Sequence, residues 1–258
     1  MYPYINLFGE KIFMTGMGIV VAFLTFLIVS IYLTRRYHQN FWKFFYRMPI
    51  LIILCYFLGS YVQFFFDVGA LPTNGAEFVT LISPYGYKFH FVGILLGVVI
   101  AIAIFLRKIK RIENKKIWTD ILFYSLTLSL VPLGIFLLMG DNFIGLSTTS
   151  ALGMKALHSE SQWNKFNFVY PIWIFLSIWA LLVAGYIRLL KRKFGIGMLW
   201  FSILLIMLAL VLLLQQYVRH GVVSLLGVTF DIKQYAAIIV AIRCFLIYRK
   251  WNKAEAKE

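Results

Sequence analysis

The sequence predicts an all-α, polytopic integral membrane protein with about seven transmembrane helices. Hydrophobic residues make up 62% of the 258 residues, above the roughly 45–50% that is usual in soluble domains. Apolar runs of a length suited to a bilayer divide the chain into seven segments. The basic residues alternate in density between these runs, since 18 of the 25 lysines and arginines follow the first, third, fifth and seventh runs.

This alternation of charge predicts the orientation of the chain. Short loops rich in lysine and arginine stay in the cytoplasm, so we expect the N-terminus outside and the C-terminus in the cytoplasm. The net charge of +15 is explained by these loops and by contact with anionic lipid headgroups, and we expect no nucleic-acid partner. No cleavable signal peptide is expected, because the start lacks a basic region followed by an apolar core.

The seven runs form one transmembrane domain over residues 1–258. Each is expected to be a helix, because backbone polar groups must be satisfied within the segment in lipid. Arg35 ends the first span, Pro49 begins the second, Trp118 is an interface anchor before the fourth, and Pro132 predicts a kink within it. Arg243 extends toward the cytoplasm from the short seventh span. The predicted spans are 12–34, 48–66, 89–106, 121–140, 166–187, 194–214 and 235–248.

Charged residues well inside the spans are few, and this disfavours a transporter or channel. A proton relay or ion pathway normally needs ionisable residues near the midplane, whereas Asp120 and Arg243 lie near span ends. Cys55 and Cys244 both fall in apolar runs, where they are best explained as small buried hydrophobes. The sequence has no pattern of metal ligands, and we expect no metal or organic cofactor.

The outward connections, roughly 67–88, 141–165 and 215–234, are longer than the cytoplasmic ones, so a site is expected there. His90, at the start of the third span, can act as a base near neutral pH. Asn142 follows Gly140, and a glycine lets the backbone approach a ligand. Arg219 can hold a phosphate with its fork of donors. The alternatives for these residues are an interface histidine, a helix stop and an interfacial anchor.

Several motifs occur in order along nearly the whole chain. They are the opening through Thr15-Gly16-Met17, Phe89-His90 followed by Gly93 and Gly97, Asn142-Phe143-Ile144, Arg219, and Leu226-Gly227 through Gln234-Tyr235. Asn142-Phe143-Ile144 looks like the core of the signature Gly-Arg-x-x-Asn-Phe-Ile-Asn-Gly-Glu, and Arg219 like the end of a Glu-Phe-Phe-Arg segment. In this order the motifs resemble the prolipoprotein diacylglyceryl transferase family.

The resemblance implies transfer of a diacylglyceryl group from phosphatidylglycerol to the lipobox cysteine of a prolipoprotein, with glycerol phosphate as leaving group. The partners would be phosphatidylglycerol or another phospholipid and the prolipoprotein signal peptide, at the outer leaflet of a bacterial inner (plasma) membrane. It implies catalytic roles for His90 as base, Arg219 as phosphate holder and Asn142 as hydrogen-bond donor. Candidate substrate-binding residues are Tyr170, Gln216, Ser147 and Thr15.

Four positions that carry charge in the family are uncharged in this chain. Met139 and Leu212 replace arginines, and Ser147 and Gln216 replace glutamates. These departures keep two alternatives open. One is a non-catalytic lipid- or lipoprotein-binding membrane scaffold of the same fold, and the other is a related transferase with another lipid or acceptor.

Overall fold

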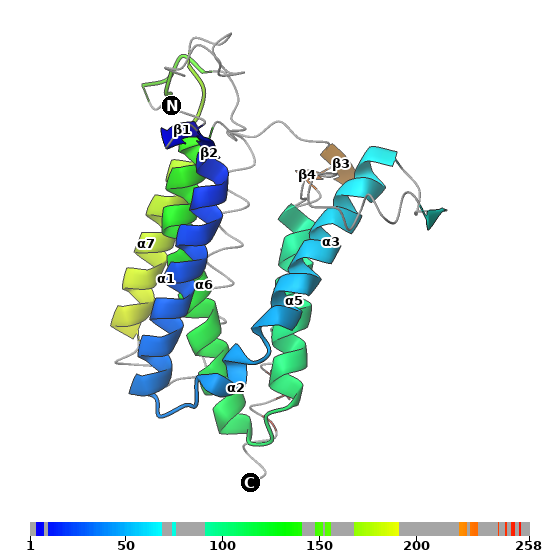
Figure 1. Cartoon of the computed structure of the whole chain (residues 1–258), viewed down its shortest axis with the longest axis vertical. Coiled ribbons are helices and arrows are strands. Elements are labelled where there is room, and N and C mark those ends of the chain that lie inside the picture. Colours follow the sequence, from blue (N-terminus) through cyan, green and yellow to red (C-terminus); the bar gives the residue numbers. More distant parts are fainter. Residues whose placement is uncertain are drawn as a thin grey trace. The chain divides into compact units, whose positions relative to one another are not determined.

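The computed structural model describes residues 4–7, 10–68, 74–75, 91–140, 148–151, 153–155, 168–190, 222–225 and 228–231, and single positions between 242 and 253. This part of the chain is mostly helical, as predicted (Figure 1). It separates into two compact units: Met1–Leu33 with Asp120–Glu258, and Thr34–Thr119.

Three helices are long and apolar enough to cross a membrane, namely Gly16–Arg36, Trp42–Val62 and Ile112–Met139. A shorter apolar helix covers Trp173–Tyr186. Only 28%, 17% and 39% of the most apolar stretches of the three long helices is buried inside the protein, so most of this apolar surface is left to face lipid. The described part therefore has the character of a helical membrane protein.

The helix bounds agree with the first three predicted spans to within about two residues. The structure has α1 at Met14–Arg36, α3 at Met48–Val68 and α5 at Phe91–Arg107. The predicted sixth and seventh spans, 194–214 and 235–248, lie outside the described residues apart from isolated positions. The number of seven spans and the orientation of the termini stay predictions.

The next two helices differ from their predicted bounds. Helix α6 is Ile112–Met139, so it begins nine residues before the predicted span, and α7 is Ile172–Leu190, which begins six residues later than predicted. Asp120 therefore lies two turns inside α6, where its side chain is buried. The polar segment 112–120 contains neither glycine nor proline, so it can continue the helix. A prediction from apolar length alone does not include such a polar extension.

The first unit contains α1, α6 from Asp120 onward and α7, which lie side by side in Figure 1. Two short antiparallel strand pairs accompany these helices. Strands β1 (Tyr4–Leu7) and β2 (Glu10–Phe13) pair with Tyr4 opposite Phe13 and lead directly into α1. Strands β3 (Val222–Leu225) and β4 (Val228–Asp231) pair within the predicted outward connection 215–234.

Helices α6 and α7 approach each other closely at Gly134. A Cβ atom at this position would lie 2.5 Å from the carbonyl oxygen of Trp173 and would clash with the hydroxyl of Ser177. The Ser177 hydroxyl donates to the Val131 carbonyl oxygen of α6 at 2.9 Å and also lies 3.0 Å from the Trp173 oxygen of its own helix. The residue after Val131 is Pro132, and α6 continues through it without a break. Small residues allow such backbone contact between membrane helices.

We predict that Gly134→Val lowers the stability of the protein in detergent by about 1–3 kcal/mol, because overpacking must separate α6 from α7. Thermal unfolding followed by circular dichroism measures this loss. The matched control is Gly185→Val on α7, where an added Cβ meets nothing within 4 Å. Equal losses in the two variants would contradict close packing at Gly134.

The second unit contains α2 (Trp42–Phe45), α3, α5 and the first turns of α6. Helices α3 and α5 lie side by side (Figure 1). Gly97 of α5 is the point of closest approach, since a Cβ there would lie 2.6 Å from the Cα of Cys55 on α3. Trp118, predicted as an interface anchor, is instead 3% exposed and packs against the rings of Phe44 and Phe105.

Helix α1 ends in a left-handed turn at His38. The His38 N–H donates to the Arg35 carbonyl oxygen and the Gln39 N–H donates to the Thr34 carbonyl oxygen, at 3.3 and 2.8 Å. His38 has φ of 54°. This is the Schellman arrangement, in which glycine usually holds the left-handed position. A histidine there is strained because its Cβ approaches the backbone.

We expect the position of His38 to respond to substitution in a characteristic order. His38→Gly should match or exceed the wild type in stability, because it removes the left-handed strain. His38→Val should lose about 1–2 kcal/mol, because a β-branched side chain tolerates this conformation poorly. Thermal unfolding of the three proteins measures the order, and a valine variant as stable as the glycine variant would disagree with it.

Candidate functional site

The structure describes only part of the predicted site. His90, Asn142, Ser147, Gln216 and Arg219 lie outside the described residues. Thr15 lies in the first turn of α1, and its side chain is not described. The remaining site residue is Tyr170, which precedes α7 and is half-buried. The described candidate site is therefore the connection between α6 and α7.

Tyr170 is held where the end of α6 meets the start of α7. It packs with Trp173 and Ile174 against a small buried cluster formed by Leu138 of α6 and Val169. Met139 is the last residue of α6 and is half-buried. The apolar contacts at Leu138 thus fix the backbone on both sides of the connection.

A two-residue β-bridge fixes the connection further. Met154 and Val169 exchange both backbone hydrogen bonds at 2.9 Å, and the Thr148 N–H donates to the Phe168 carbonyl oxygen at 3.0 Å. Between Thr148 and Met154 the chain makes a turn, in which the Gly153 N–H donates to the Ser150 carbonyl oxygen. This pairing brings residues 148–155 beside residues 168–170, directly before α7.

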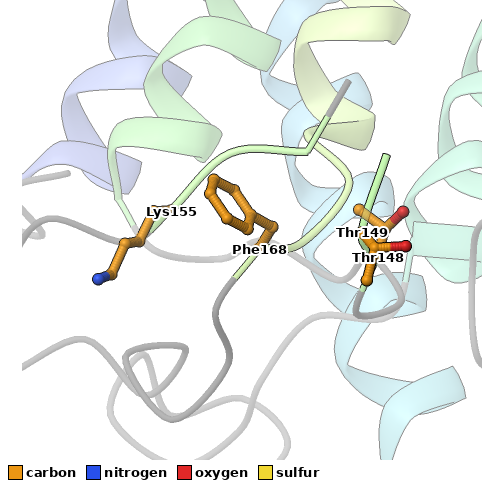
Figure 2. A pocket seen from close by; sticks show the side chains of 4 residues that line it. All are labelled: Thr148, Thr149, Lys155 and Phe168. Carbon is orange, nitrogen blue, oxygen red and sulfur yellow. The ribbon is translucent and has the colours of Figure 1, made fainter. Parts of the chain in front are cut away.

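An open pocket of about 280 Å³ lies on this connection and is lined by Thr148, Thr149, Lys155 and Phe168. Figure 2 shows the Phe168 ring between Lys155 and the two threonines. Lys155, Thr149 and Phe168 are exposed, and Thr148 is half-buried. Lys155 is the charged side chain among the described residues that line the pocket.

The pocket is suited to binding an anion that carries an apolar part. A lysine ammonium and two hydroxyls are donors for phosphate or carboxylate oxygens. The face and edge of Phe168 offer an apolar wall for the carbon skeleton of the same ligand. The four lining residues include neither a nucleophile with a neighbouring base nor an acid–base pair. These four residues offer donors and an apolar wall, which suit binding.

No group of three or more histidine, cysteine, aspartate or glutamate side chains suited to a metal ion occurs within the described residues. The free thiol of Cys55 lies in α3. The ligands of a metal site, if the protein binds one, would have to include residues outside the described part of the chain.

The pocket residues were not singled out from the sequence. Their proximity depends on the Met154–Val169 bridge, which pairs residues 15 positions apart and leaves no local periodicity. The sequence feature that could have indicated this pocket is the presence of Lys155 a few residues after Thr148 and Thr149, in the same predicted outward connection.

Comparison with known proteins adds no family to this description. No protein-family model matches the chain, and no curated protein is significantly similar to it.

We predict that Gly153→Val opens the bridged connection. A Cβ there would lie 2.8 Å from the Thr148 methyl group and 2.9 Å from the Phe168 Cβ, so the loop must shift. The amides of Met154 and Val169 should then exchange with deuterium at least about tenfold faster, because overpacking costs roughly 1–3 kcal/mol. Gly16→Val is the control, since an added Cβ at Gly16 has open space. Unchanged exchange at Met154 in the Gly153 variant would contradict this packing.

Proposed function

We propose that the chain is a membrane-embedded lipid transferase, which moves a diacylglyceryl group from phosphatidylglycerol to the lipobox cysteine of a prolipoprotein. The observation that carries the proposal furthest is the open pocket on the α6–α7 connection, which Lys155, Thr148 and Thr149 line with hydrogen-bond donors. The pocket offers donors for a phosphate at the end of two apolar helices. The ordered motifs around His90, Asn142 and Arg219 supply the chemistry that the pocket lacks.

The reaction requires one S–C bond to form while one C–O bond breaks. The lipobox thiol loses its proton to His90, because the thiolate is the nucleophile. The sulfur attacks the glycerol carbon that carries the phosphate, and glycerol phosphate departs with the electron pair of the C–O bond. Arg219 and the ammonium of Lys155 offset the negative charge on the departing phosphate. Asn142 and Tyr170 hydrogen-bond to the polar groups of the substrates.

The second candidate is a lipid- or lipoprotein-binding scaffold that performs no reaction. It is favoured by the uncharged residues at four positions where the family carries charge, of which Met139 lies at the end of α6. Without those charges, the pocket would still retain an anionic lipid. A related transferase with another lipid donor or acceptor uses the same His90 chemistry with a different headgroup.

Phosphatidylglycerol transfer tests the proposal directly. Purified protein in vesicles containing phosphatidylglycerol is given a lipobox peptide, and we expect the peptide to gain the mass of one diacylglyceryl unit. His90→Ala should lower the rate by roughly 10²–10⁴-fold, because general base catalysis is lost. His158 lies in the predicted outward connection 141–165, so His158→Ala is the control and should keep the wild-type rate. Wild-type transfer by His90→Ala would exclude His90 as the base.

The Lys155 pocket distinguishes the candidates in the same vesicles. Lys155→Gln should raise the phosphatidylglycerol concentration needed for half-maximal transfer about fivefold, because one cation near an anionic headgroup is lost. Lys155→Arg preserves the charge and should behave like the wild type. If no variant transfers lipid but Lys155→Gln loses retained phosphatidylglycerol, the scaffold is supported. Transfer from another donor in a lipid panel supports the related transferase.

A further inference from the structure

The short helix α2 presents aromatic side chains outward at the most basic part of the second unit. Its backbone is held by the Trp42 N–H, which donates to Asn40 Oδ1 at 3.0 Å, and by the Tyr46 N–H, which donates to the Trp42 carbonyl oxygen at 3.1 Å. The segment is therefore an ordered turn between α1 and α3. The residues that it exposes are Trp42, Lys43, Phe45 and Tyr46, which we term the α2 platform.

One residue of α2 points inward and fixes the platform to the rest of the unit. Phe44 is 2% exposed. Its ring centroid lies 5.2 Å from that of Phe105 on α5 and 5.9 Å from that of Trp118 on α6. The Arg47 guanidinium lies 5.5 Å from the centroid of Phe105. The three rings explain why α2 has a single orientation, because aromatic pairs of this kind bury large apolar areas.

The outward rings have no comparable cover. Trp42 is 59% exposed and Tyr46 is 76% exposed. They contact each other with centroids 6.1 Å apart, and Trp42 meets Phe45 edge to face at 5.4 Å. An exposed cluster of tryptophan, tyrosine and phenylalanine with a lysine among them is typical of the headgroup level of a membrane.

The length of α3 places the platform at that level and not in the hydrocarbon core. Helix α3 has 21 residues, which corresponds to about 31 Å at 1.5 Å per residue. The hydrocarbon core is about 30 Å thick. The apolar stretch Trp42–Val62 includes α2 by length and composition, but α3 is by itself long enough to cross the core. With α3 as the crossing helix, α2 lies before it, beyond Tyr46 and Arg47, at the surface of the bilayer.

The charge around the platform favours anionic lipid. Residues 35–47 and 107–116, all in the second unit, contain ten lysines and arginines and one acid, Glu113. The side chain of Gln39 donates to Asn114 Oδ1 at 3.3 Å, which ties the segment before α2 to the start of α6 within this basic region. The exposed cations are Arg35, Arg36, Lys43, Arg107, Lys108, Lys110 and Arg111.

We infer that the α2 platform and these exposed cations form a binding site for an anionic phospholipid of the leaflet predicted to be cytoplasmic. The headgroup phosphate pairs with Lys43 and its cationic neighbours, and the glycerol and upper acyl chains lie against Trp42, Phe45 and Tyr46. This lipid is bound and not transformed. The site is separate from the Lys155 pocket and does not depend on the proposed transferase activity.

Photocrosslinking identifies what covers the platform. Tyr46 is replaced by p-benzoylphenylalanine in the full chain, which is reconstituted in vesicles of phosphatidylglycerol and phosphatidylcholine at equal amounts and irradiated. Mass spectrometry of the adducts should show phosphatidylglycerol in about fivefold excess over phosphatidylcholine. The same replacement at Ile53, an exposed residue of α3, should give adducts in the bulk ratio. A bulk ratio at Tyr46, or a protein-sized adduct, would overturn the inference.

Charge variants and a soluble competitor complete the test. Lys43→Gln should lower the lipid ratio at Tyr46 about fivefold, whereas Lys155→Gln should leave it unchanged. Inorganic phosphate at fixed ionic strength should also leave the ratio unchanged. If phosphate abolishes the preference and chloride does not, the region is a soluble-phosphate site and the lipid assignment fails. If Lys43→Gln keeps the ratio while its thermal stability is unchanged, Lys43 does not select the headgroup.

Discussion

The close approach of neighbouring helices at glycine is the constraint on which the packing of each unit depends. In lipid, apolar side chains gain little by leaving their surroundings, so helices associate through van der Waals contact and a few polar bonds. Gly134 allows α6 to meet α7, Gly97 allows α5 to meet α3, and a Cβ at Gly18 of α1 would lie 2.5 Å from the Phe136 Cβ of α6. The hydroxyl of Ser177 adds an interhelical hydrogen bond at one of these contacts.

The candidate site follows from the contact between α6 and α7. Leu138 and Val169 join the end of one helix to the segment before the next, and the Met154–Val169 bridge places the pocket beside that joint. Backbone hydrogen bonds hold the neighbours of Lys155, since Met154 pairs with Val169 and the Thr148 N–H donates to the Phe168 carbonyl oxygen. A loop whose backbone is fixed in this way needs less ordering when it binds a ligand.

The lengths of the apolar runs in the sequence predicted where the helices lie, but they did not predict the polar residues that extend a helix. Arg35 was predicted to end the first span and Pro49 to begin the second, and helices α1, α3 and α5 lie within about two residues of the first three predicted ranges. The early start of α6 was missed because the predicted span followed apolarity alone, whereas the polar segment from Ile112 is also helical. The burial of Trp118 could not be predicted, because it depends on non-local contacts with Phe44 and Phe105. The pocket was missed for the same reason, since Thr148 and Lys155 meet Phe168 only through a non-local bridge. Tyr170 is the predicted site residue whose side chain the structure describes, and it packs against Leu138 and Val169.

Helix α6 has 28 residues, or about 42 Å, whereas the hydrocarbon core is about 30 Å thick. Its surplus length lies at the polar amino-terminal end, where Glu113 is exposed, Asn114 accepts a hydrogen bond from Gln39 and Lys116 is buried. Charged residues are costly in hydrocarbon, so the extra turns of α6 extend the helix beyond the core as a polar stem, whose side chains contact the protein and not lipid tails.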